Sequence, residues 1–246
     1  MRILIANANT TEAVTQAVAA EARRHAAPGT EIVPATAAFG VGIVSTEAGN
    51  AIAGHAALDV LARHVGQVDA AVLAISFDTA LAAGQELMPF PVVGMTAAAL
   101  HTACLLGRRF GLISFGAGTR WMYADVVAAS GLGARLAGHE VIPMETAKDY
   151  LDAGRLDDAV LHASRRLHDA GASSVVIAGA AIAGMATRLQ PMSTVHLLDG
   201  IACAVRIAEL LVGLGARAAP GRPLSGVDAS KNLDAALARA LSCSPA

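Results

Sequence analysis

A short loop that follows an aliphatic run holds the side chains best suited to chemistry. In order along the chain it reads Ile75, Ser76, Phe77, Asp78, Thr79. The hydroxyl of Ser76 can act as a nucleophile or hydrogen-bond donor, and the carboxyl of Asp78 can exchange a proton. Asp78 and Thr79 can also simply cap the helix that follows. Ser76 and Asp78 are our candidate catalytic residues, and we expect Ile75, Phe77 and Thr79 to contact the substrate.

Two further loops offer polar groups for binding a small molecule. Residues 6–11 place Asn9 and Thr10 before a predicted helix, where their side chains and free backbone N–H groups can bind an anionic or amide-bearing group. Helix capping alone would explain one threonine of this loop. Ser114 ends a predicted strand, and Gly116 beyond it lets the backbone approach a ligand closely. We expect Asn9, Thr10 and Ser114 to bind substrate.

A fourth loop is bare of reactive side chains. Residues 175–186 read VVIAGAAIAGMA, the pattern of a buried strand that runs into a small-residue loop and a helix. In α/β enzymes, functional residues usually lie at such a place. No side chain here exchanges a proton or binds a metal, so backbone N–H groups are what the loop offers. We expect a substrate to contact Ala181, Ile182, Ala183 and Gly184.

Strands and helices that position these loops alternate along the chain. Aliphatic runs predict strands covered on both faces near residues 3–6, 31–34, 70–75, 91–94, 110–114, 140–143, 174–178 and 195–198. Helical spacing predicts helices near residues 10–25, 47–65, 80–87, 96–106, 120–130, 156–170 and 200–214. Thr10 or Thr11 would cap the first helix, and residues 216–226 form the clearest loop. The alternation predicts an α/β fold with mostly parallel sheets.

The order of elements also repeats in outline. Residues 70–106 and 174–214 each run strand, loop, short helix, strand and helix. This repeat indicates two pseudo-symmetric lobes, each a mostly parallel sheet flanked by helices, with the active site in the cleft between them. Coincidence is the alternative, because any α/β chain shows approximate repeats. We place lobe 1 at residues 1–97, joined by the C-terminal segment 206–246, and lobe 2 at residues 98–205.

Composition and charge exclude several classes of partner. The chain is 54% hydrophobic, 3% aromatic and 15% charged, with a net charge of −2. No basic run is present that would follow a nucleic acid, so we expect no nucleic-acid partner. The apolar stretch at 87–107 is broken by two prolines and a glycine, so it does not predict a membrane span of about 20 residues. The first residues become polar too soon for a signal peptide, and we expect a cytoplasmic protein.

The cysteines give no sign of a metal site. Cys104, Cys203 and Cys243 are scattered, without the C-x-x-C pair that marks a metal cluster, and their odd number disfavours a disulfide framework. Cys104 and Cys203 fall within apolar helical runs, where a cysteine is usually an inert small hydrophobic residue. We therefore expect no metal.

Three stretches of sequence, in order along the chain, match the motifs of a known family. The opening ILIANANTT is similar to Ile-Asn-Pro-Asn-Thr-Ser, with Ala8 in place of proline. FPVVGMTAAALHTACLLGRRFGLIS (90–114) resembles Val-Val-Gly…Ala-Ala-Leu-His…Leu-Gly-Arg-Arg-Phe, and VHLLDGIACAVRIAELL (195–211) resembles Val-Ile-Asp-Gly-Val-Ala-Ala-Ala-Val. These motifs mark the hydantoin and allantoin racemase branch of the aspartate/glutamate racemase superfamily. The resemblance implies two α/β lobes, an active site between them, no metal or cofactor, and a homo-oligomer.

The resemblance also implies a chemistry whose key groups this chain lacks. Racemisation removes an α-proton from one face of a carbon and returns one to the other, and the family uses one cysteine on each of two loops. Alignment on Asp78 places Ile75 at the first cysteine, and a shifted gap offers only Ser76 or Phe77. Alignment on Gly184 and Met185 places Ile182 at the second, with Ala181 or Ala183 beside it. A two-thiol mechanism is therefore ruled out.

Three hypotheses about function follow from the sequence. The first is a racemase of this family that acts on a small hydantoin-, ureide- or amino-acid-like substrate through other groups. The second is a lyase, decarboxylase or hydrolase on the same fold, and the third is a non-catalytic binding protein. The resemblance along the whole chain favours the first. Solvent exchange at the α-carbon of a substrate would distinguish it from a net chemical change or from binding alone.

Overall fold

A computed structural model describes residues 1–144, 153–216 and 231–242. Within these residues the strands form two four-stranded sheets, with orders β2-β1-β3-β4 and β6-β5-β7-β8. The strands are β1 (Arg2–Asn7), β2 (Glu31–Thr36), β3 (Ala70–Leu73), β4 (Val92–Gly94), β5 (Phe110–Phe115), β6 (Leu136–Ile142), β7 (Ser174–Ile177) and β8 (His196–Asp199). All strand pairs in this part of the chain are parallel. The predicted α/β fold with two parallel sheets is confirmed.

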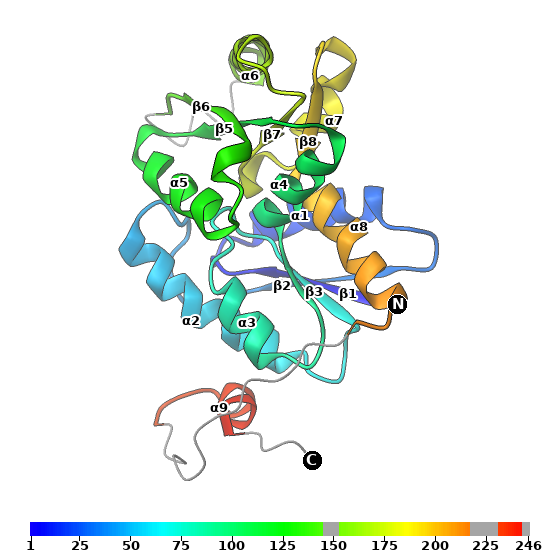
Figure 1. Cartoon of the computed structure of the whole chain (residues 1–246). Helices are drawn as coiled ribbons and strands as arrows, with labels where there is room; N and C mark the ends of the chain where they lie inside the picture. The colour runs from blue at the N-terminus through cyan, green and yellow to red at the C-terminus, as the bar shows by residue number, and fades with distance from the viewer. Residues whose placement is uncertain (145–152, 217–230, 243–246) are drawn as a thin grey trace.

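Helices lie on both faces of each sheet (Figure 1). Their bounds are α1 (Glu12–His25), α2 (Glu47–Arg63), α3 (Leu81–Leu87), α4 (Met95–Leu106), α5 (Arg120–Ala129), α6 (Ala153–Asp169), α7 (Met185–Leu189), α8 (Gly200–Gly213) and α9 (Ala235–Ser242). Helices α2 and α3 cover the outer face of the first sheet, and α6 and α7 cover the outer face of the second. Helices α1, α4 and α8 lie between the two sheets.

The layer between the sheets is one continuous apolar core. Ile5 and Val72 of the first sheet and Leu112 and Val176 of the second belong to the same cluster of buried side chains, together with Leu100 of α4. Burial of apolar surface stabilises such a cluster by about 25 cal/mol for each Å² removed from water. The two lobes therefore share their main core.

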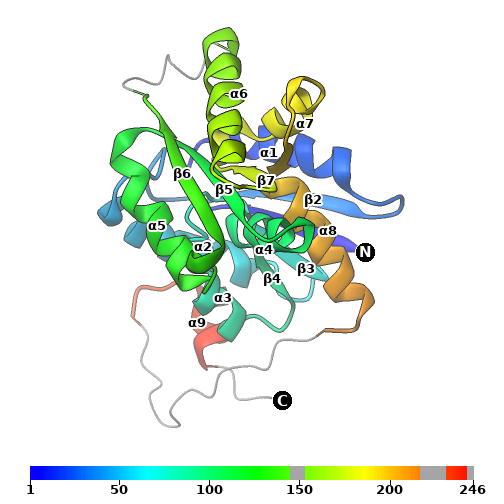
Figure 2. The ribbon, with the colours of Figure 1, turned by 45° about the horizontal axis from the view of Figure 1, so that its top comes forward.

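Helices α4 and α8 each cross to the other lobe. Helix α4 follows β4 of the first sheet but also packs on β7 of the second, and α8 follows β8 of the second sheet but packs on β3 and β4 of the first. The two helices pack against each other (Figure 2). We propose that one lobe consists of residues 1–97 and 206–246, and that the other consists of residues 98–205.

Strand order brings the candidate loops to the centre of each sheet. In the first sheet β1 leads to α1 on the inner face, and its neighbour β3 leads to α3 on the outer face. In the second sheet β5 leads to α5 and its neighbour β7 leads to α7, again on opposite faces. Ligands of α/β proteins bind where connections diverge in this way, at the carboxyl ends of the strands.

The structure differs from the sequence predictions at a few boundaries. Strand β6 begins at Leu136 instead of residue 140, because its first part pairs with β5 across a register shift and lacks an apolar run. Helix α9 was not predicted, and its Leu237 packs with the α2 residues. Helix α1 begins after Thr11 as expected, but the Thr11 hydroxyl donates to the carbonyl of Gly42 instead of capping the helix. Most of the predicted loop at 216–226 lies outside the described residues.

No helix in the described ranges is both long enough and apolar enough to cross a membrane. The apolar stretch at 87–107 folds instead as a turn, the short strand β4 and helix α4. The two prolines end one element before the next begins, as expected from their missing N–H groups.

The contact between α4 and α8 makes Gly200 intolerant of a side chain. A Cβ at Gly200 would lie 2.9 Å from the carbonyl oxygen of Met95, which is backbone and cannot rotate away. We expect Gly200→Ala to lower the free energy of unfolding by about 1–3 kcal/mol, measured by urea denaturation. Gly213 lies in the same helix, and a Cβ there would meet no neighbouring atom within 4 Å. Gly213→Ala should be neutral or raise stability by up to about 1 kcal/mol, and equal losses in the two variants would contradict the packing argument.

Candidate active site

Ser76 and Ala180 join the two facing loops. The backbone N–H of Ala180, after β7, donates to Ser76 Oγ, after β3, at 3.1 Å. The structure therefore brings together the loops that the sequence placed at equivalent positions in the two lobes. Ser76 is half-buried. Its oxygen accepts this bond, and no acceptor for its own proton is found in the described part of the chain, so that proton is available to a ligand.

The carboxyl of Asp78 ties the first loop to the N-terminus of α4. Its Oδ1 accepts from the N–H of Thr96 at 3.0 Å, and its Oδ2 accepts from the N–H of Ala97 at 2.6 Å. Gly94 leaves room for this carboxyl, since a Cβ there would lie 2.5 Å from Asp78 Cγ. The alternative that Asp78 caps the helix directly after it is wrong, because it caps the helix beyond the next strand.

Burial changes the acidity of this carboxyl. Loss of water raises the pKa of Asp78 to about 7, and the hydrogen bonds from Ala97 and Thr96 oppose that rise. The residue also has a positive φ of 48°, an uncommon backbone conformation for a side chain other than glycine. A carboxyl that titrates near neutral pH can both take and give a proton, which suits acid–base catalysis.

A pocket of about 790 Å³ opens beside Asp78. Its apolar walls come from the first loop, α3 and α5 and include Phe77, Leu81, Met122 and Val126. Polar groups at its edge come from α2, α4 and α5 and include Glu47, Asn50, His101 and Asp125. A pocket of this size and mixed lining is typical of a small-molecule site. Helix α5 carries residues of the second lobe's sequence, so this pocket draws on both halves of the chain.

Ile75 and Thr79, at the two ends of the first loop, have buried side chains. The Thr79 hydroxyl donates to Asn50 Oδ1 at 2.5 Å, which ties the loop to α2. Thr79 therefore does not cap the following helix, and that alternative is wrong as well. Ile75 is buried in the core of the first lobe. Contact of either side chain with substrate stays a prediction.

The bare loop turns on two glycines. Gly179 and Gly184 have φ values of 144° and 89°, a region that favours glycine. Between them Ala181 is exposed, and Ile182 and Ala183 are half-buried. The loop presents main-chain atoms and small apolar side chains, in agreement with its sequence.

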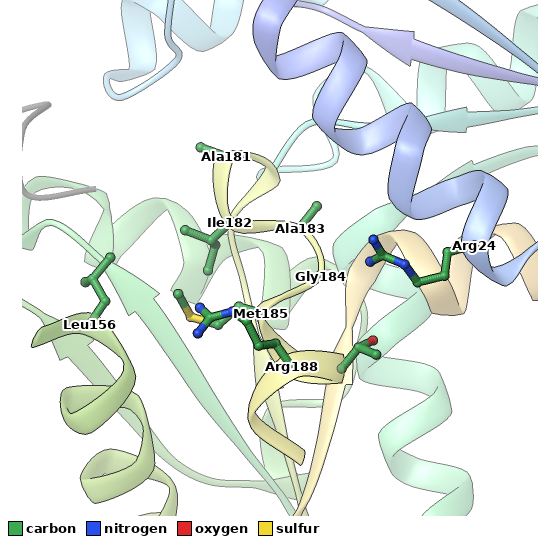
Figure 3. Close-up of a pocket in the computed structure, with 9 residues that line it drawn as sticks. Arg24, Leu156, Ala181, Ile182, Ala183, Gly184, Met185 and Arg188 are labelled. Atoms are coloured by element: carbon green, nitrogen blue, oxygen red, sulfur yellow. The ribbon is translucent and has the colours of Figure 1, made fainter. Parts of the chain in front are cut away.

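A second pocket, of about 520 Å³, lies against this bare loop (Figure 3). Arg24 of α1 and Arg188 of α7 flank it from opposite sides. Arg24 pairs with Glu21, and Arg188 pairs with Asp157. The two positive charges are thus balanced by carboxylates, and they do not by themselves make an anion site.

Asn9 is used within its own loop. Its Oδ1 accepts from the Thr11 N–H at 2.9 Å and from Asn7 Nδ2 at 3.0 Å. Its own N–H donates to Asn7 Oδ1. Thr10 has an exposed side chain, and its N–H donates to the carbonyl of Val41. Neither Asn9 nor Thr10 lines the two pockets described above, and their contact with substrate stays a prediction.

Ser114 is fully buried in the second sheet, and its Oγ lies 2.7 Å from His139 Nε2. Burial, helped by the positive charge of Arg120, lowers the pKa of His139 to about 4, so this histidine is neutral at pH 7. The ring of Tyr123 contacts both His139 and Phe77. Ser114 thus reaches the first loop through a chain of side chains. No spacing in the sequence indicated that His139 and Tyr123 belong near this site.

The described cysteines do not replace the missing thiols. Burial raises the pKa of the Cys203 thiol to about 11, so it stays protonated at neutral pH. Cys104 lies in α4, away from both loops in sequence and half-buried. Among the residues that the structure describes, no group of three His, Cys, Asp or Glu side chains is arranged to hold a metal ion.

Together these features define a two-lobed α/β protein that presents facing loops and small-molecule pockets at the carboxyl ends of parallel strands. A sequence profile of the Asp/Glu/hydantoin racemase family matches residues 3–208. The chain belongs to this family, which confirms the resemblance seen in its motifs.

The relatives that match most of the chain at 29% identity are racemases. A hydantoin racemase of Paenarthrobacter aurescens is 29% identical over 218 residues, which cover 87% of this chain and 92% of that protein. The structure of allantoin racemase from Klebsiella pneumoniae has a TM-score of 0.82 at 29% identity and covers 92% of this chain and 97% of that one. Allantoin racemase from Pseudomonas fluorescens has a TM-score of 0.77 at 29% identity, with coverage of 92% and 100%. These matches favour a racemase over the lyase, hydrolase and binding-protein alternatives.

Asp78 should make the protein less stable as the pH rises. The pKa of Asp78 is about 7 in the folded chain against an ordinary value of 3.8. Between these values the folded carboxyl keeps a proton that the unfolded one has lost, so each rise in pH within this window favours unfolding. We expect Asp78→Asn to remove this contribution, so that stability in urea denaturation falls less with pH between about pH 4 and pH 7 than it does in the unchanged protein.

Glu47→Gln is the matched control, since Glu47 is an exposed carboxyl at the same pocket. It should leave the pH slope unchanged. Asparagine offers one acceptor in place of two, so Asp78→Asn can lower stability at every pH. The same pH dependence in Asp78→Asn as in the unchanged protein would contradict the assignment.

Proposed function

We propose that this chain is a racemase-type isomerase that acts on a small cyclic ureide of the hydantoin class, without a pair of cysteines. Family membership and the hydantoin and allantoin racemases it resembles support the reaction and the substrate class. The observation that carries the proposal for the site is Asp78, a buried carboxyl with a pKa of about 7 beside a pocket of about 790 Å³.

In the proposed reaction the Asp78 carboxylate removes the proton from the stereogenic carbon of the ring. This carbon lies next to a carbonyl, so the electron pair of the broken C–H bond moves into the carbonyl and forms an enolate. The hydroxyl group of Ser76, in the same loop, donates a hydrogen bond to the enolate oxygen. Hydrogen-bond donors held ready for a developing charge are usually the largest single contribution to such a reaction.

Return of the proton completes the inversion. A planar enolate no longer distinguishes its two faces, so a proton added to the face opposite Asp78 gives the other enantiomer. Ile75 and Ile182, at the positions that align with the family's cysteines, cannot supply it. We assign this proton to water that enters the pocket. The hydroxide that remains takes the proton from the Asp78 carboxyl, which restores the carboxylate, so the reaction depends on one protein base instead of two.

Setting and assembly complete the proposal. We propose that the protein works in the cytoplasm, as a homo-oligomer, on a small-molecule substrate. The free thiols of Cys104 and Cys203 fit a reducing compartment. Leu105 and Trp121 have exposed fractions of 88% and 74%, and apolar side chains of this kind are suited to burial against a second copy.

Exchange of the α-proton tests the proposed function directly. Proton NMR in D₂O would follow the protein with 5-substituted hydantoins, allantoin and α-amino acids. We expect the α-proton signal of a hydantoin or of allantoin to disappear faster than in buffer, and deuterium to appear in both enantiomers. Exchange confined to amino acids would overturn the substrate class. No exchange across the panel would overturn the racemase function itself.

Substitution of Asp78 tests the proposed base. We expect Asp78→Asn to slow α-proton exchange by at least about 100-fold, because a general base typically contributes that much. In the unchanged protein the exchange rate should rise as the pH passes about 7, where the Asp78 carboxyl with its raised pKa becomes ionised. Asp169→Asn, an exposed carboxyl on α6, is the control and should leave the rate unchanged. Full activity in Asp78→Asn would assign the proton transfer to another group.

A further inference from the structure

Asp199, in the third motif of the sequence, bonds two separate parts of the second lobe with one buried carboxyl. Its Oδ1 accepts from the N–H groups of Ile201 at 2.8 Å and Ala202 at 3.3 Å, which caps α8. Its Oδ2 accepts from the N–H of Gly184 at 2.7 Å. Each oxygen therefore has its own task, one in the helix and one in the bare loop.

Gly184 is the point at which the bare loop turns into α7. Its φ is positive, and a Cβ there would lie 2.9 Å from Glu21 Oε2 of α1. The buried Glu21 also accepts a hydrogen bond from the Thr187 hydroxyl. The end of the loop is thus enclosed by α1 of the first lobe on one side and by Asp199 on the other.

The bare loop can act on a substrate only through its main chain. Ala181, Ile182 and Ala183 have no polar side chains, and the N–H groups of Ile182 and Ala183 donate to the carbonyls of Gly179 and Ala180. The path of the main chain therefore decides where the N–H of Ala181 and the carbonyl oxygens of this turn meet a ligand. Asp199 accepts a hydrogen bond from the Gly184 N–H, directly after these residues, and burial raises the pKa of this carboxyl. An acceptor buried in this way fixes the direction of the main chain where the loop ends.

The two lobes use the same kind of link with the carboxyl on opposite partners. In the first lobe the loop carries Asp78, which reaches the N-terminus of α4. In the second lobe the helix carries Asp199 at its N-terminus, and this carboxyl reaches the loop. Helices α4 and α8 pack on each other. Both loops are therefore held by hydrogen bonds at the N-termini of one helix pair.

We propose that Asp199 is a positioning residue, which ties the bare loop to the N-terminus of α8 and so sets the loop's main chain against the substrate. Its effect on turnover rests on the proposed function, since the loop matters to catalysis only if the substrate lies against it. Its effect on the loop does not depend on any reaction.

Asp199→Ser separates the two tasks of this carboxyl. Serine caps helices as well as aspartate does, but its single oxygen cannot reach Gly184 while it caps α8. We expect hydrogen–deuterium exchange of the backbone in residues 179–189 to become at least about tenfold faster, with α8 still protected. We expect kcat for a hydantoin to fall by about 10- to 100-fold with a smaller change in KM, because small errors of position cost rate.

Asp234→Ser is the matched control. Asp234 also combines a helix cap, to the N–H of Ala236 at 2.8 Å, with a second bond, to Arg63 at 3.0 Å. It serves α9, away from the loops, so this variant should reproduce the general cost of losing such a carboxyl. It should leave both kcat and loop exchange unchanged.

The two measurements keep the outcomes apart. Faster loop exchange together with a lower kcat in Asp199→Ser supports the proposal. Unchanged loop exchange overturns it, and so does faster loop exchange with an unchanged kcat. If the unchanged protein turns over no hydantoin while the loop is still released in Asp199→Ser, the proposed function fails and the structural link stands.

Discussion

The close approach of α4 and α8 is the contact on which the rest of the structure depends. The backbone of Met95 leaves no space for a side chain at Gly200, so the N-termini of the two helices lie backbone to backbone. Asp78 binds the N-terminus of α4 and Asp199 caps α8. The loops of both lobes therefore take their positions from one helix pair, and Ser76 can bond directly to Ala180.

Asp78 holds opposing physical demands in one side chain. Burial disfavours its charge, whereas two N–H groups at a helix N-terminus favour it, and the balance leaves its pKa near neutrality. The environment of a thiol can likewise bring its pKa near neutrality, so a buried carboxyl and a thiol can exchange protons over the same range of pH. Ile75 is buried and Ile182 is half-buried, and neither side chain can exchange a proton. In the proposed reaction, acid–base chemistry depends on how the main chain around Asp78 is arranged.

The sequence predicted the elements better than the contacts between them. Runs of aliphatic residues indicated the strands. The family motifs and the bare loop could also be recognised in the sequence. The predicted start of strand β6 was too late because the first part of this strand lacks an apolar run. Helix α9 was missed because it is short. The bonds from Asp78 to Thr96, and from Asp199 to Gly184, were not predictable, since they join segments 18 and 15 residues apart whose meeting depends on tertiary packing.

The exchange of α4 and α8 between the lobes also bears on how the chain is made. The first sheet is complete once β4 has been synthesised, but part of its inner face is covered only by α8, more than a hundred residues later in the sequence. During synthesis this apolar face stays open and prone to wrong contacts while the second lobe emerges. The core of the first lobe is therefore complete only after α8 has been synthesised. Neither half of the chain contains all the helices that cover its own sheet.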